Sequence, residues 1–199
     1  MITKAIFLAC FSLISSNGEV NVDIFFESKC PDSIKFIKEQ LWPTYQVLDK
    51  EIVSFKLYPY GNAHTVISQN ETISFECQHG PQECLLNTVE ACVINQTPTD
   101  VSIKFIYCLE KNPTEKRAQR CSEYLKIDWE KLSACYKGLE GKNLLRKTGE
   151  ATPAHTFIPW IVVDGDSDES IQEKALSDLL KLVCEKYYEK SGTIPRSCY

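Results

Sequence analysis

The pattern of apolar and polar residues between positions 20 and 58 predicts a strand, a helix and a second strand. Residues 20–26 and 52–58 alternate with a period of two, as half-buried strands do. Between them, apolar side chains recur at three- and four-residue spacing, which predicts a helix of about four turns that Pro43 kinks. A helical crossover of this length joins parallel strands in a right-handed βαβ unit.

The next part of the chain has a different character. From about residue 62 to residue 150 the pattern predicts short helices and no convincing strand. Six cysteines fall in this part. We therefore interpret it as a helical insertion whose thin core is stapled by disulfides.

The C-terminal part returns to sheet. Residues 161–163 predict a strand, and Asp164-Gly165 is typical of a hairpin turn that leads into a further strand. A last helix has this apolar face: Leu176, Leu179, Leu180, Val183 and Tyr187. The order of the elements, with Pro159 directly before the third strand, predicts an α/β, thioredoxin-like fold with a helical insertion. Residues 19–199 are expected to form a single domain.

The first 18 residues predict a secretory signal peptide. Lys4 precedes an apolar run of about 11 residues, and small residues follow at positions 15, 16 and 18. The run is shorter than the roughly 20 residues of a membrane-spanning helix, and the alternative interpretation is a buried first strand. No later segment is long and apolar enough to cross a membrane, so we expect a soluble protein of the secretory pathway, either secreted or lysosomal.

Composition narrows the function classes. Apolar residues make up 43% of the chain, enough for a packed core, which argues against a disordered or fibrous protein. The net charge of −5 and the lack of a basic stripe argue against nucleic-acid binding, which depends on clustered lysine and arginine. Acceptor sequons at Asn70 and Asn95 predict glycosylation, in agreement with the secretory pathway.

The cysteines also indicate an oxidising compartment. The chain has ten, and nine remain once the signal peptide removes Cys10. Because nine is odd, at least one thiol is free or pairs with another chain, and we expect that thiol to be Cys30. The other eight are expected in disulfides, although spacing does not choose their pairing: Cys77, Cys84, Cys92, Cys108, Cys121, Cys135, Cys184 and Cys198.

Cys30 begins the segment Cys30-Pro31-Asp32-Ser33, which lies between the first predicted strand and the helix. A dithiol oxidoreductase keeps its attacking sulfur at such a place. The helix N-terminus and Lys29 favour the thiolate there, whereas Asp32 opposes it. A redox pair needs a second cysteine at position 33, where this chain has Ser33.

Residues 77–92 read CQHGPQECLLNTVEAC and match C-Q-H-G-x-x-E-C-x-x-N-x-x-x-x-C at every specified position. In this motif the chain resembles the gamma-interferon-inducible lysosomal thiol reductase (GILT) family. Further pieces resemble the same family: Pro59-Tyr60-Gly61-Asn62-Ala63, Ile158-Pro159-Trp160, Val163-Asp164-Gly165, and Cys184 with Cys198. The likeness extends over residues 20–198, nearly all of the chain that follows the predicted signal peptide.

The resemblance implies a thioredoxin-like fold with a C-x-x-C centre that reduces protein disulfides in acidic compartments. It further implies that Cys30 is the nucleophile, that Pro159 is a cis-proline facing it, and that the signature cysteines form structural disulfides. Ser33 departs from the family pattern. Serine cannot form a disulfide with Cys30, so the departure predicts an impaired reductase cycle.

A zinc site formed by Cys77, His79, Cys84 and Cys92 is the alternative to disulfides in the signature segment. The spacings lack the short C-x-x-C type of clip that structural zinc sites use, so we predict disulfides and no metal. His79 and Glu83 are expected to orient the loop by hydrogen bonds rather than to take part in chemistry.

The residues are compatible with two functions. The first is a GILT-like thiol–disulfide oxidoreductase that acts on protein disulfides through Cys30 alone, with no cofactor and with an external thiol such as glutathione or cysteine as reductant. The alternative is a secreted binding or regulatory protein that keeps the fold without catalysis. The expected partners are disulfide-bonded protein substrates or a protein partner, and no nucleic acid.

Overall fold

The computed structural model describes residues 18–199 of the chain. Apart from Gly18, the predicted signal peptide lies outside the described residues. No helix within residues 18–199 is long and apolar enough to cross a membrane.

The centre of the structure is a sheet in which β1 (Val20–Phe26) lies between β2 (Val53–Pro59) and β5 (Trp160–Val163). β1 pairs in parallel with β2 and antiparallel with β5. As the middle strand it has neighbours on both edges and packing on both faces, which explains why most of its residues are buried. The two strands predicted around the first helix, and their parallel pairing, are confirmed.

The helix between β1 and β2 is continuous but not uniform. It consists of α1 (Pro31–Phe36), a π-helical stretch η1 (Ile37–Leu41) and α2 (Trp42–Val47). The Trp42 N–H donates to the carbonyl of Ile37, five residues earlier. Pro43 has no N–H to give to the ladder, and the wide turn before it accommodates that loss. The proline therefore follows a π-helical turn within one helix, and the kink stays a prediction.

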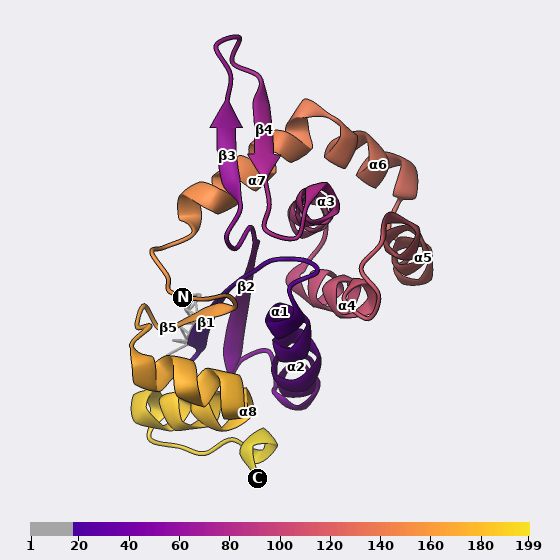
Figure 1. Cartoon of the computed structure of the whole chain (residues 1–199). Helices are drawn as coiled ribbons and strands as arrows, with labels where there is room; N and C mark the ends of the chain where they lie inside the picture. Colours follow the sequence, from indigo (N-terminus) through magenta and orange to yellow (C-terminus); the bar gives the residue numbers. More distant parts are fainter. Residues whose placement is uncertain (1–17) are drawn as a thin grey trace, which may run out of the picture.

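The insertion carries most of the helices. Its elements are β3 (His64–Ile67), β4 (Ile73–Glu76), α3 (Pro81–Gln96), α4 (Thr99–Leu109), α5 (Glu115–Leu125), α6 (Trp129–Lys137) and α7 (Leu139–Ala151). The helices predicted here are confirmed, but the prediction of no strand is wrong. β3 and β4 form an antiparallel hairpin that projects from the body of the molecule (Figure 1). β4 alternates, with Ile73 and Phe75 partly buried, but it is only four residues long, and β3 shows no such alternation. The pattern was therefore too short to predict a hairpin.

The prediction of a further strand after Asp164-Gly165 is also wrong. The turn does form, with positive φ at both residues. Beyond it only an isolated bridge joins Val163 and Asp166, and Asp168 then caps α8 (Glu169–Ser191) by accepting the Ile171 N–H. The chain therefore enters a helix before a strand can extend. A short 3₁₀ helix, η2 (Arg196–Cys198), ends the chain.

α8 presents most of the predicted apolar face to the core, because Leu180 and Tyr187 are partly buried against it. Leu179 and Val183 are buried, whereas Leu176 is exposed. Asp178 has non-helical backbone angles, φ −155° and ψ 79°, so the helix is interrupted between these residues. The buried residues keep helical spacing across the break: Ile171, Ala175, Leu179 and Val183.

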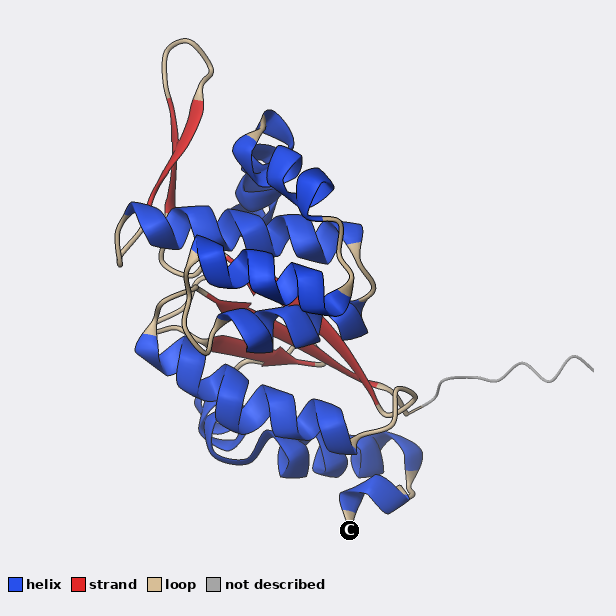
Figure 2. Cartoon of the chain, turned by 90° about the vertical axis from the view of Figure 1, so that its right-hand side faces the viewer, coloured by secondary structure: helices blue, strands red, loops and turns tan. Residues whose placement is uncertain are grey.

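Helices cover both faces of the sheet (Figure 2). α8 packs with the α1–α2 helix on one side, and α3 and α7 pack on β2 from the other. One buried cluster runs from β1 through α1 to the insertion helices, so the insertion shares the core of the sheet. The fold is α/β and thioredoxin-like, with a disulfide-stapled insertion that is mostly helical.

Candidate active site

Cys30 is the N-cap residue of α1, and Pro31 is the first residue of that helix. The Cys30 carbonyl accepts the Ile34 N–H, and this is the first hydrogen bond of the helix. Cys30 is only 7% exposed. The Sγ atom lies 3.9 Å from the carbonyl oxygen of Ile158, and the Ile158–Pro159 peptide bond is cis. The structure therefore places Cys30 at the loop that carries Pro159, where β5 begins beside β1.

Ser33 lies one helical turn after Cys30 and is fully buried. Its Oγ accepts a hydrogen bond from the Glu27 N–H at 3.4 Å. Within residues 18–199, the hydroxyl makes no hydrogen bond to Cys30. The Ser33 oxygen is thus hydrogen-bonded to the backbone that precedes Cys30.

Hydrogen bonds to the insertion fix the loop between β1 and Cys30. The Ser28 N–H donates to Asn87 Oδ1 at 2.8 Å, and the Ser28 hydroxyl donates to Glu110 Oε1 at 2.5 Å. The Lys29 N–H points to Glu110 Oε2 at 3.4 Å. Glu90, on α3, is also fully buried. Sequence reasoning missed Glu90 and Glu110, because only the packing of α3 and the end of α4 under this loop brings them there.

Burial controls the protonation of this carboxyl pair. Desolvation raises the pKa of Glu110 to about 7, although the Ser28 hydroxyl and the Lys29 N–H act in the opposite direction. Desolvation also raises the pKa of Glu90 well above its ordinary value, and the neighbouring charge of Glu110 adds to the effect. The pair is therefore neutral at acidic pH, and ionisation near neutral pH places charge in the core beneath the Cys30 loop.

We expect the folded protein to lose stability as the pH rises from 4.5 to 7. In this window folded Glu110 keeps a proton that the unfolded chain has released, so the free energy of unfolding falls, by about 3 kcal/mol for Glu110 alone. Glu110→Gln imitates the protonated form and should remove the part of the fall that Glu110 contributes, whereas the part that comes from the raised pKa of Glu90 should remain. Urea unfolding of both proteins at the two pH values measures the fall.

The exposed carboxylate of Glu130, on α6, offers the control. Glu130→Gln should leave the pH dependence of the wild type unchanged. A wild type whose fall in stability is the same as that of Glu110→Gln would contradict the role of Glu110.

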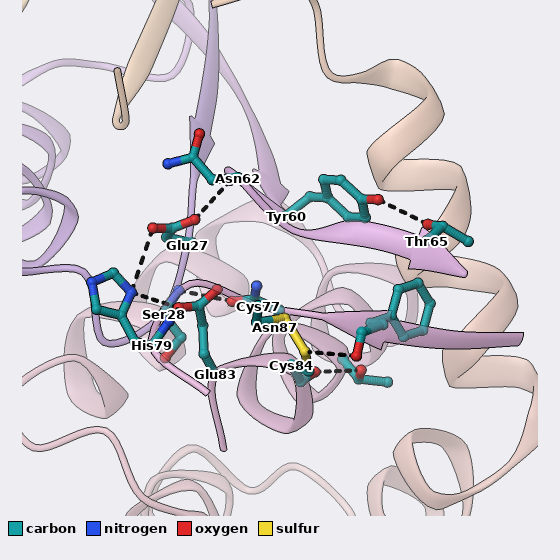
Figure 3. The surroundings of a disulfide bond; sticks show 12 residues. Glu27, Ser28, Tyr60, Asn62, Thr65, Cys77, His79, Glu83, Cys84 and Asn87 are labelled. Carbon is teal, nitrogen blue, oxygen red and sulfur yellow. Dashed lines mark hydrogen bonds and ion pairs between the residues drawn. A yellow bond between two sulfur atoms is a disulfide. The ribbon is translucent and has the colours of Figure 1, made fainter. Parts of the chain in front are cut away.

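A second polar cluster lies beside the same loop and joins it to the signature segment (Figure 3). Glu83 Oε2 accepts the His79 N–H at 2.7 Å and lies 2.5 Å from His79 Nδ1. Glu27 Oε1 is 3.5 Å from the same nitrogen, and Glu27 Oε2 accepts the Asn62 N–H at 2.7 Å. Desolvation raises the pKa of Glu27, and the charge of Glu83 adds to this, whereas the Asn62 N–H and His79 lower it.

The cluster depends on close packing of the Glu27 side chain. Gly61 has a φ of +55°, and a Cβ atom there would collide with Glu27 Oε2. The hydrogen bonds predicted for His79 and Glu83 are present. Glu27 was missed, because it lies at the end of β1, far from the signature segment in the sequence, and no local pattern marks it.

The eight remaining cysteines of residues 18–199 form four disulfides, and Cys30 is the free one. The pairs are Cys77–Cys84, Cys92–Cys135, Cys108–Cys121 and Cys184–Cys198. Pairing removes the thiolates that the alternative zinc site would need. The two sequon residues are exposed, with Asn70 in the turn of the β3–β4 hairpin and Asn95 near the end of α3.

Sequence comparison identifies relatives of this chain. A sequence model of the family "Gamma interferon inducible lysosomal thiol reductase (GILT)" matches residues 21–125. The gamma-interferon-inducible lysosomal thiol reductase of Carassius auratus is 34% identical over 90% of this chain and 72% of its own length. The gamma-interferon-responsive lysosomal thiol protein of Arabidopsis thaliana is 31% identical over 99% of this chain and 86% of its own length.

Among solved structures, the oxidoreductase DsbA from Xylella fastidiosa aligns with a TM-score of 0.48 and 16% identity, over 86% of this chain and 88% of that one. The family match includes all of β1 except Val20, the Cys30 segment and the whole signature motif. The chain therefore belongs to the gamma interferon inducible lysosomal thiol reductase (GILT) family.

Proposed function

We propose that this protein carries out thiol–disulfide exchange on disulfide-bonded proteins through Cys30 alone. The observation that carries the proposal is a free thiol at the N-terminus of α1, against the Ile158–Pro159 loop, with Ser33 where a second thiol would stand. Membership of a thiol reductase family supports the same chemistry.

The cycle begins when the Cys30 thiolate attacks one sulfur of a substrate disulfide. A Cys30–substrate mixed disulfide forms, and the other substrate sulfur leaves as a thiolate that takes up a proton. Ser33 cannot continue the reaction, because its oxygen forms no disulfide. An external thiol such as glutathione or cysteine then attacks the mixed disulfide. If it attacks the Cys30 sulfur, the substrate leaves as a thiol, and a second external thiol frees Cys30 as the oxidised external disulfide forms. A second thiol of the same substrate can attack instead, and the result is isomerisation.

A non-catalytic binding or regulatory protein is the second candidate. The burial of Cys30, only 7% exposed, favours it, because a substrate disulfide must reach that sulfur. The full burial of Ser33 favours it as well. Under this alternative the fold and its disulfides serve to present a surface to a protein partner.

An insulin-reduction assay with and without glutathione separates the candidates. We expect wild-type turnover with glutathione, little without it, and none for Cys30→Ser in either condition, because each round needs an external thiol to release Cys30. The thermal midpoint of Cys30→Ser should match that of the wild type, which would show that the variant is folded. Wild type that is as inactive as Cys30→Ser in both conditions would leave only the binding function.

We also propose that the protein acts in the secretory pathway, either in the lysosome or outside the cell. The four disulfides and the exposed sequon residues Asn70 and Asn95 support this location. The relatives named as lysosomal support it too. The predicted loss of stability between pH 4.5 and 7 fits an acidic compartment better than a neutral one.

A further inference from the structure

Three side chains of types that can bind metals lie close together beside the Cys30 loop and come from separate parts of the chain (Figure 3). Glu27 follows β1, His79 lies in the loop before α3, and Glu83 lies in the first turn of α3. One donor atom from each lies within 4.8 Å of the other two. The side chains of Glu27 and Glu83 are 1% and 0% exposed, whereas that of His79 is 29% exposed. The cluster is thus buried on two sides and reachable from solvent through the histidine.

Two buried carboxylate oxygens of this cluster lack a hydrogen-bond partner in the described part of the chain. Glu27 Oε1 faces His79 Nδ1 at 3.5 Å without a hydrogen bond, and Glu83 Oε1 has no partner within residues 18–199. Two buried carboxylates share one imidazole, which supplies at most one positive charge. Isolated buried charge is strongly unfavourable, and a divalent cation would balance both carboxylates.

The types of donor atom in this cluster are those that zinc prefers. Two carboxylates and one imidazole suit divalent transition metals, and zinc accepts both donor types at about 2.0–2.2 Å. Tetrahedral bonds of this length separate neighbouring donor atoms by about 3.3 Å. The separations from His79 Nδ1, 2.5 Å to Glu83 and 3.5 Å to Glu27, lie on either side of that value.

We infer that Glu27, His79 and Glu83 form a binding site for a zinc ion, with the open side at His79 left for water or another ligand. The sequence predicted no metal, and this site departs from that prediction. The only metal site weighed there was cysteine-based, and the present site uses none of its sulfurs. Because the Glu27 N–H donates to Ser33 Oγ, an ion held by Glu27 also fixes the backbone before Cys30. The inference does not depend on the proposed exchange activity.

Titration calorimetry with zinc chloride tests the site, using the chain in which Cys30→Ser removes the competing thiol. We expect one zinc ion per chain. Adding Glu83→Gln should weaken binding by at least about 100-fold, because it removes a direct ligand, and second-shell changes alone cost 10–100-fold. His64→Gln on the exposed strand β3 is the matched control and should leave the affinity unchanged.

A measurement without a cluster variant covers the case in which Glu83→Gln fails to fold. Diethyl pyrocarbonate modifies accessible imidazoles, and zinc should protect His79 while leaving His64 and His155 reactive. Protection of His79 together with one-to-one binding would support the site. Absence of zinc binding, binding that survives Glu83→Gln in a folded protein, or equal protection of all three histidines would overturn it.

Discussion

Ser33→Cys is expected to raise the rate of glutathione-driven insulin reduction by roughly 100-fold or more, since an intramolecular thiol has a very high effective concentration. Position 33 lies one helical turn after Cys30 on the same side of α1. A thiolate there attacks the Cys30 sulfur of the mixed disulfide, so the substrate leaves as a thiol and a disulfide between Cys30 and the introduced cysteine remains. Glutathione then reduces this disulfide, and the two electrons reach the substrate in one enzyme-bound sequence.

The buried environment of Ser33 does not oppose this change. The serine hydroxyl accepts one long hydrogen bond, from the Glu27 N–H. Replacing the oxygen by sulfur should therefore cost little folding free energy. Wild-type protein should accumulate the mixed disulfide when external thiol is scarce, whereas Ser33→Cys should not. Quenching the reaction with acid and separating the adducts by mass measures this difference directly.

Two variants serve as controls for the gain. Ser33→Ala removes the same hydrogen bond without adding a thiol and should show no increase. Cys30→Ser combined with Ser33→Cys keeps the new thiol but lacks the nucleophile, and it should be inactive. An equal increase in Ser33→Ala would mean that relaxation of the loop, rather than a resolving thiol, limits the wild type.

Removing the Cys92–Cys135 disulfide is expected to lower the free energy of unfolding by about 4 kcal/mol, from the loop that it closes in the unfolded chain. The two cysteines are 43 residues apart and almost completely buried, and they tie α3 to α6. Alanine at both positions also leaves unfilled space in the core, which adds to the loss. Urea unfolding of Cys92→Ala/Cys135→Ala at pH 4.5 measures the effect.

The Cys184–Cys198 disulfide is the comparison. It closes a shorter loop, with a separation of 14 residues, between α8 and the terminal helix η2. Loop entropy alone predicts about 3 kcal/mol, and the measured loss should be smaller because η2 can detach without opening the core. A terminal pair that costs as much as Cys92–Cys135 would contradict the central role of the α3–α6 link.

The α3–α6 disulfide also bears on the Cys30 loop. α3 carries Asn87, which binds the Ser28 N–H, together with Glu83 and Glu90. A displaced α3 would therefore release contacts on both sides of the loop. The stability of the insertion and the geometry of the thiol are coupled through this single helix.

Local pattern determined much of this protein. The alternation in residues 20–26 and 52–58 and the helical spacing between them predicted the βαβ unit that places Cys30 at the start of α1. The signature motif predicted the family, because it is read residue by residue and needs no packing. The segment Cys30-Pro31-Asp32-Ser33 by itself showed a serine where a C-x-x-C pair has its second cysteine.

Other features were decided only in three dimensions. The strands of the β3–β4 hairpin have four residues each, and only β4 alternates, which is too little pattern to predict a hairpin. The cap at Asp168 ended the strand that the Asp164-Gly165 turn predicted. The pairing of eight cysteines depends on which helices pack together. The same is true of the buried carboxylates of Glu27, Glu90 and Glu110, which lie directly after β1, in α3 and directly after α4. A sequence pattern reports which side of an element is buried, whereas the neighbours of a buried group are set by the packing of elements distant along the chain.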